Sequence, residues 1–153
     1  MKLQCAILDD YQQVALKMAD WTSIEEQVAV HSFSKHFDKE EELIGAIQDC
    51  EIIVIMRERT PFTASLFEKL PKLKLLITSG MRNASIDLVA ASKHGVAVCG
   101  TASSSEPPTE LTWALILNLA RKVTLENTAL RENGHWQSTI GADLHGKTLG
   151  LLG

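Results

Sequence analysis

Arginines and a glycine stand where two apolar runs end, and these residue types suit the binding of a carboxylate. Arg57 and Arg59 follow one run, and Gly80 comes just after the next run along the chain. A planar guanidinium matches the two oxygens of a carboxylate, and a glycine lets successive backbone N–H groups turn toward an anion. The alternative is that the arginines are surface residues paired with neighbouring acids such as Glu58. The candidate substrate-binding residues are Arg57, Arg59, Gly80, Met81, Arg82 and Asn83.

An acidic pair, Asp9-Asp10, follows the first apolar run. Such a pair is found in phosphoacceptor receiver domains, which also need an Asp after the third strand and a Lys after the fifth. Those positions hold Met56-Arg57 and Cys99-Gly100, so magnesium and phosphoryl chemistry lack their main ligands. The pair is better explained as a turn that caps the following helix.

Histidine and cysteine spacing indicates no metal or catalytic site in this chain. None of the 5 histidines has ligand spacing, so we assign none a role in catalysis and expect no bound metal. The 3 cysteines, Cys5, Cys50 and Cys99, lie in or beside apolar runs and are expected to be buried free thiols in a reducing cytoplasm. A net charge of −4 argues against nucleic acid as a partner. No apolar run approaches the roughly 20 residues of a membrane span.

Five short apolar runs alternate with segments of helical periodicity, which predicts an α/β fold with a parallel sheet covered by helices on both faces. Thr63 and Ser85 are expected to cap the second and third helices, and Gly95 to end the third. The layout is flavodoxin-like, and ligands bind such sheets at the carboxyl ends of the strands. The expected strands are 3–8, 28–33, 51–56, 73–78 and 96–99.

The chain changes character after the fifth run, which indicates a domain boundary. We expect a first domain over residues 1–100, a linker of small residues and prolines over 101–108, and a second segment over 109–153. A long helix is expected from Thr109 to about Asn133, with Gly134 at its C-cap. Its apolar residues cover most of its circumference, which favours packing against a second copy in a homodimer.

Residues 146–153 form a short apolar run that closes on Gly153. A strand ending on glycine is how a dinucleotide-binding unit begins its G-x-G-x-x-G loop. Gly153 is expected to be the first of these glycines, in the first strand of a truncated Rossmann domain. The other two do not occur within the 153 residues, so we expect this chain alone to bind no dinucleotide.

Several segments, in order along the chain, resemble the family of D-isomer-specific 2-hydroxyacid dehydrogenases. Residues 57–60 resemble the R-S-R-T strand end of that family, and residues 73–87 resemble its P-x-L-K-L-I-x-x-A-G-V-G-x-D-x-I-D block. The remaining matches are residues 95–98 with G-I-x-V, 109–112 with A-E-H-T, 134–136 with G-x-W, and 144–150 with L-x-G-K-T-L-G. Two positions depart from the pattern: Met81-Arg82 replaces V-G, which places a large cation in the pocket, and Ser104 replaces a frequent Asn.

The resemblance implies the substrate-binding domain of an NAD- or NADP-dependent oxidoreductase that interconverts a D-2-hydroxy acid and a 2-oxo acid. It implies that main-chain groups of Met81 and Arg82 hold the substrate carboxylate, and that Ser104, Glu110 and Gly153 face the cofactor. The catalytic Arg, Glu and His of the family are expected beyond Gly153. In related full-length enzymes the 109–133 helix lies at a two-fold dimer interface. The alternative function is a non-enzymatic module of the same fold that binds a carboxylate or a partner protein.

Overall fold

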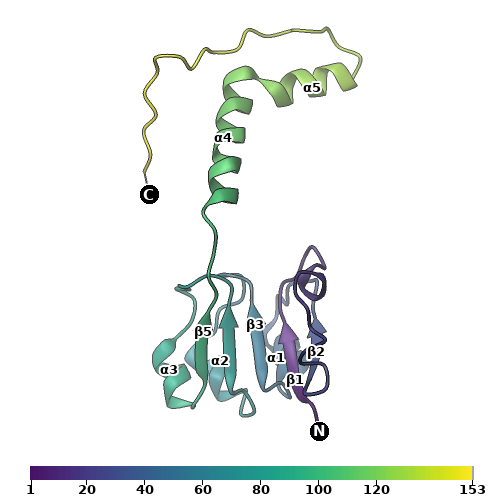
Figure 1. Ribbon diagram of the computed structural model, residues 1–153, viewed down its shortest axis with the longest axis vertical. Coiled ribbons are helices and arrows are strands. Elements are labelled where there is room, and N and C mark those ends of the chain that lie inside the picture. Colours follow the sequence, from purple (N-terminus) through teal and green to yellow (C-terminus); the bar gives the residue numbers. More distant parts are fainter. Residues whose placement is uncertain (153) are drawn as a thin grey trace. The chain divides into compact units, whose positions relative to one another are not determined.

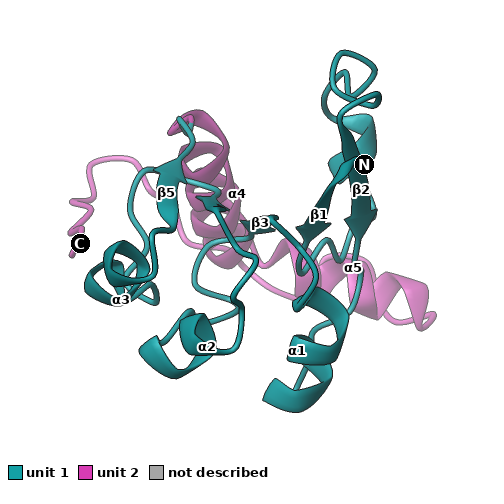
Figure 2. Ribbon diagram, turned by 90° about the horizontal axis from the view of Figure 1, so that it is seen from below, with its two compact units in different colours: residues 1–103 teal, residues 104–153 magenta. Residues whose placement is uncertain are grey.

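The computed structural model describes residues 1–152, which divide into one compact unit over residues 1–103 and another that begins at Ser104 (Figure 2). Gly153, which the sequence predicts to contact the cofactor, lies outside the described residues. None of the helices in residues 1–152 has the length and apolar character needed to cross a bilayer.

The first unit is built on a five-stranded parallel sheet, and this confirms the predicted α/β fold. All strands point the same way (Figure 1) and follow the order β2-β1-β3-β4-β5, which is the flavodoxin-like order. The strands are β1 (Leu3–Ile7), β2 (Val28–Ser32), β3 (Ile52–Ile55), β4 (Leu75–Thr78) and β5 (Ala97–Gly100).

Three α-helices lie on one face of this sheet (Figure 2): α1 (Glu40–Ile47), α2 (Ala64–Glu68) and α3 (Leu88–Lys93). From β2 to β5 the chain advances across the sheet in one direction, and right-handed crossovers then place every connecting helix on the same face. The β1–β2 connection runs in the opposite direction and contains only a 3-10 helix, η1 (Ala15–Lys17). In the described part of the first unit, the second face therefore carries no α-helix, where the sequence pattern suggested one.

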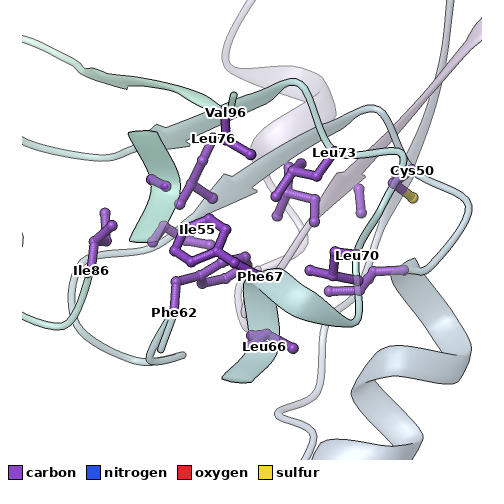
Figure 3. Close-up of a cluster of buried hydrophobic side chains, with 14 of the residues drawn as sticks. Cys50, Ile55, Phe62, Leu66, Phe67, Leu70, Leu73, Leu76, Ile86 and Val96 are labelled. Carbon is purple, nitrogen blue, oxygen red and sulfur yellow. The ribbon is translucent and has the colours of Figure 1, made fainter. Parts of the chain in front are cut away.

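The core fills the space between the sheet and its helices. Phe62 and Phe67 pack with ring centres 5.7 Å apart beneath Ile55 and Leu76, and all four are essentially inaccessible to solvent (Figure 3). Burying each of these large side chains contributes about 1.5–3 kcal/mol, as an upper estimate.

The cysteines differ from the sequence-based expectation in one case. Cys5 and Cys50 are buried free thiols as expected, and burial raises the pKa of Cys5 to about 11. Cys99, however, is exposed. It pairs in register with Ile77 on the sheet face that lacks α-helices, so nothing in the first unit encloses it.

The starts of α2 and α3 are set by side-chain caps, with one correction to the sequence prediction. Thr63 caps α2 as predicted, because its hydroxyl accepts from the amide of Leu66 at 3.3 Å. The predicted cap of α3 was wrong: Asp87 accepts from the amide of Ala90 at 2.9 Å, whereas the Ser85 hydroxyl donates to Asn83. Asp is at least as good a cap as Ser. The Ser85 hydroxyl is already hydrogen-bonded to the Asn83 side chain and so does not cap the helix.

The second unit contains α4 (Glu106–Arg121) and α5 (Val123–Arg131), where the sequence predicted one helix over 109–133. Lys122 adopts a left-handed conformation with φ 56°, and the Asn118 carboxamide accepts from the Thr124 amide at 2.8 Å. This local cap stabilises the break. Residues 106–108, which were assigned to the linker, form the first turn of α4, where proline is tolerated because the first amides have no helical partner.

Two further C-terminal predictions are corrected. Asn133, with φ 58°, takes the left-handed position that ends α5, while the following Gly134 amide donates to Ala129 at 2.7 Å. The apolar run at residues 149–152 forms no strand, since a parallel strand needs a hydrogen-bonded neighbour and none pairs with it in the described chain.

Candidate functional site

The loop after β4 is held in a tight turn by Gly80, as the sequence predicted. Gly80 has φ +92°, a conformation that side-chain-bearing residues rarely adopt. The Ser79 amide still donates to Ile55 at 3.0 Å, and the Gly80 amide donates to the Thr101 hydroxyl at 3.0 Å. The Gly80 amide is therefore engaged within the protein, and any anion must be held by the amides that follow it.

The next two amides have the properties expected of anion donors. Within residues 1–152, no group accepts a hydrogen bond from the amide of Met81 or that of Arg82. Both residues are exposed. Two successive amides without protein partners, at the carboxyl end of a parallel strand, are candidate donors for an anion.

Gly100 and Thr101 support this turn, and sequence reasoning did not single them out. A Cβ atom on Gly100 would lie 2.8 Å from the Gly80 carbonyl oxygen and 2.8 Å from the Met81 Cα. The loop thus packs directly on the end of β5, and only glycine permits that approach. The available signal was a glycine at the end of the fifth apolar run followed at once by a threonine.

Arg57 lies against the Gly80 turn through both its backbone and its side chain. Its amide donates to the Ser79 hydroxyl at 3.0 Å, and its carbonyl accepts from the Asn83 carboxamide at 2.6 Å. Its guanidinium covers Gly80 so closely that a Cβ there would be 2.5 Å from Nη1. A loose contact of 3.7 Å joins Nε to Glu58, and both side chains are largely solvent-accessible. Arg57 therefore keeps donors available beside the free amides.

Arg59 is directed elsewhere, so the three arginines do not converge as the sequence suggested. Its Nη1 donates to the Asp9 carbonyl at 2.8 Å, and its guanidinium carbon lies 4.4 Å from the centre of the Tyr11 ring. Arg59 thus joins the end of β3 to the end of β1. Among the predicted substrate-binding residues, Arg57, Gly80, Met81, Arg82 and Asn83 are brought together, and Arg59 supports a neighbouring cluster.

A cavity of about 450 Å³ opens next to the Gly80 turn. Its lining combines polar groups of Thr78, Arg82 and Asn83 with apolar side chains that include Ile86, Leu88 and Val98. A lining that mixes polar and apolar groups is suited to a small organic acid.

The acidic pair after β1 divides into two roles. Asp10 forms a turn and stabilises the start of η1 from outside the helix, because its carboxylate accepts from the amides of Val14 and Ala15 at 3.0 and 3.1 Å. Asp9 is 1% exposed and accepts from Thr60 at 2.6 Å and from Tyr11 at 3.2 Å. Partial desolvation and the nearby Asp9 carboxylate raise the pKa of Tyr11, which keeps its hydroxyl a donor.

The predicted cofactor residues of the second unit are described, but their role stays a prediction. Ser104 donates its hydroxyl to the carboxylate of Glu106 near the start of α4, and Glu110 is an exposed residue of that helix. Across residues 1–152, no three histidine, cysteine or acidic side chains are grouped to hold a metal.

Comparison with known proteins gives a consistent result. Residues 5–139 match the model of the D-isomer specific 2-hydroxyacid dehydrogenase catalytic domain. The chain is 37% identical to human D-3-phosphoglycerate dehydrogenase over 116 residues, which is 74% of this chain and 21% of that enzyme. It is 34% identical to a hydroxypyruvate reductase of Thermotoga maritima over 123 residues, which is 78% of this chain and 39% of that protein.

The solved structures include a phosphoglycerate oxidoreductase from Vibrio cholerae O395, which matches with a TM-score of 0.84 and 34% identity. The match covers 95% of this chain and 47% of the Vibrio chain. The chain therefore spans from about a fifth to just under half of the length of these relatives.

Proposed function

The chain belongs to the family of D-isomer specific 2-hydroxyacid dehydrogenases, and on this premise we propose that it forms the substrate-binding part of an NAD- or NADP-dependent oxidoreductase. The reaction would interconvert a D-2-hydroxy acid and a 2-oxo acid. In it, the nicotinamide cofactor supplies or accepts the hydride when bound. The task of this chain is to bind and orient the acid.

The observation that carries the proposal is the pair of unbonded amides at Met81 and Arg82 beside the guanidinium of Arg57. The amides would donate to the substrate carboxylate, and the arginine would supply positive charge and further donors. The apolar side chains that line the adjacent cavity would contact the rest of a short acid. Holding the carboxylate in this way fixes the orientation of the C2 atom, which is what a positioning domain must achieve for hydride transfer.

We further propose that the 153-residue chain transfers no hydride by itself. A pyrophosphate site requires the three glycines of G-x-G-x-x-G, and this motif does not occur in residues 1–153. A homodimer through α4 and α5 is proposed from exposed apolar side chains, among them Trp113 at 52%, Leu115 at 52% and Leu119 at 72% exposure. The cytoplasmic location stays a prediction.

Titration of isotope-labelled chain with pyruvate or glyoxylate, followed by amide NMR, tests the proposed site. The Met81 and Arg82 resonances should shift with saturation, because their amides would donate to the carboxylate. Acetate serves as a control for general carboxylate binding and should shift the same resonances more weakly. Saturable shifts confined to another strand end, or none at all, would show that the site is wrong.

A further inference from the structure

We propose that Asp9 is a positioning residue for the anion site, and that it acts by fixing the loop of residues 56–63, which carries Arg57 to Gly80. This inference rests on the proposed function in that it assigns Arg57 a part in carboxylate binding. Asp9 itself is 1% exposed and negatively charged, so it neither reaches nor attracts an anionic ligand. Any effect of Asp9 on ligand binding must therefore be transmitted by the residues to which it is hydrogen-bonded.

Asp9 contacts this loop twice, once with its side chain and once with its backbone. The carboxylate accepts from the Thr60 hydroxyl at 2.6 Å, and the carbonyl accepts from the Arg59 guanidinium at 2.8 Å. Thr60 is buried as well, at 5% exposure. Hydrogen bonds to a buried carboxylate are strong because little water competes with them. The C-terminal half of the loop is therefore tied to the end of β1.

The N-terminal half of the same loop is tied to the β4 side. The amide and carbonyl of Arg57 bond to Ser79 and Asn83, at 3.0 and 2.6 Å. Arg57 has φ 54°, a conformation uncommon for residues with a side chain, which persists only where the surroundings enforce it. The loop is thus held between two strand ends, and its position places the Arg57 guanidinium over Gly80.

Two further groups, from the loops after β1 and β2, contact the Asp9 carboxylate and orient it. His36 Nδ1 lies 2.8 Å from Oδ1 of Asp9, and the Tyr11 hydroxyl donates to the same oxygen at 3.2 Å. The Arg59 guanidinium stacks on the Tyr11 ring, which adds a cation–π contact to this cluster. Asp9 also adopts a left-handed backbone with φ 59°. A buried carboxylate with donors on both oxygens and an enforced backbone is rigid, and rigidity is what positioning requires.

The neighbouring Asp10 provides a matched control. It is buried to a similar degree, at 5% exposure, and its carboxylate also accepts several hydrogen bonds. Its partners are the amides of Val14 and Ala15 and the hydroxyl of Ser32, and none of them belongs to the 56–63 loop. Asp9→Asn and Asp10→Asn therefore make the same chemical change at adjacent residues. Only Asp9 is hydrogen-bonded to the loop that carries Arg57.

A double-mutant cycle measured by pyruvate titration tests the proposal. Asp9→Asn should weaken binding by about 5-fold, which corresponds to the loss of roughly one hydrogen bond to the ligand. In the Arg57→Ala background the same change should have an effect of less than about 2-fold, since the group through which Asp9 acts is gone. Asp10→Asn should leave affinity within about 2-fold in both backgrounds. Equal losses from Asp9→Asn with and without Arg57 would overturn the proposal.

A second measurement separates this inference from the proposed function. In amide spectra without ligand, Asp9→Asn should shift Arg57 and Gly80, and Asp10→Asn should leave them unchanged. Unmoved resonances at Arg57 and Gly80 in Asp9→Asn would refute the positioning role, whatever the chain binds. If pyruvate fails to bind the unmodified chain while those resonances move, the proposed function is wrong and the loop coupling stands. Where Asp9→Asn does not fold, Thr60→Val removes one of the two ties and should produce the same shifts.

Discussion

Alanine substitutions at Gly80, Gly95 and Gly45 separate two effects at the anion site. One is strain in a left-handed backbone, and the other is the displacement of the Arg57 side chain. Gly80→Ala places a methyl group on a residue with φ +92° and 2.5 Å from Arg57 Nη1. The left-handed backbone costs roughly 1–2 kcal/mol for a residue with a Cβ. The contacting atom ends a flexible side chain, so the Arg57 guanidinium is expected to move away. We expect Gly80→Ala to lose both stability and pyruvate binding.

Gly95→Ala is the control for backbone strain. Gly95 has φ +72°, and a Cβ there would meet no heavy atom within 4 Å. The strain is similar, about 1–2 kcal/mol, but no arginine is displaced. Gly45→Ala is the control for the substitution itself, because Gly45 is exposed in α1 and a Cβ there also meets nothing within 4 Å. Alanine inside a helix should add about 0.5–1 kcal/mol.

Urea unfolding gives the stability changes, and titration with pyruvate gives the affinity. At this chain length 1 kcal/mol corresponds to a shift in Tm of roughly 2–4 °C. We expect Gly80→Ala and Gly95→Ala to be destabilised alike, with binding lost only in Gly80→Ala. The reasoning is refuted if Gly80→Ala binds pyruvate as well as the unmodified chain, or if Gly95→Ala loses binding to the same extent.

Four further predictions concern other parts of the chain. Arg82→Ala should weaken pyruvate binding several-fold without changing the urea midpoint, since the Arg82 side chain is exposed; unchanged affinity would show that this side chain takes no part in the site. Leu115→Glu with Leu119→Glu should convert a dimer of about twice 16.8 kDa into monomer or aggregate in light scattering, and a well-folded monomer of the unmodified chain contradicts the dimer. Calorimetry with NADH should detect no micromolar binding, and a saturable signal would disprove the inactivity of this chain. The Thr139 hydroxyl and the Ser138 amide hold the pKa of Glu126 below its ordinary value of 4.5, so its stabilising effect is complete above that pH and is lost as the pH falls through the lowered pKa. Glu126→Gln should therefore flatten the acid limb of the thermal-stability profile, and an unaltered limb would count against this role.

The elements of the fold could be predicted because their signals are local. Each apolar run coincides with a strand to within two residues at either end, since burial on a sheet demands a short continuous apolar segment. The Thr63 cap and the turn at Gly80 were predictable for a similar reason: a hydroxyl next to a helix start and a glycine after a strand act on atoms a few residues away.

Other features of the site depended on partners far apart in the sequence. Asp9 and Thr60 are 51 residues apart, and their hydrogen bond exists only because β1 and β3 are neighbours in the sheet. Because β1 and β3 are neighbours, Arg59 bonds to Asp9 and does not reach the Gly80 turn. In the sequence, Arg57 and Arg59 both follow the same strand and cannot be told apart. No periodicity in the chain indicates which of the two arginines turns toward β4.

Competition between equally suitable groups was decided by local hydrogen bonds that residue type alone does not predict. Ser85 and Asp87 are both good helix caps, and Asn83 settled the choice by engaging Ser85. Lys122 lies within a helical pattern, yet the Asn118 carboxamide stabilises a break there. The sequence determines which residues can adopt a given backbone conformation without strain. The packing of the sheet determines which hydrogen-bond partner comes within 3 Å of each of them. For Asp9, the partners Arg59 and Thr60 lie in the loop after the neighbouring strand β3, and the end of β5 at Gly100 packs against the turn after β4.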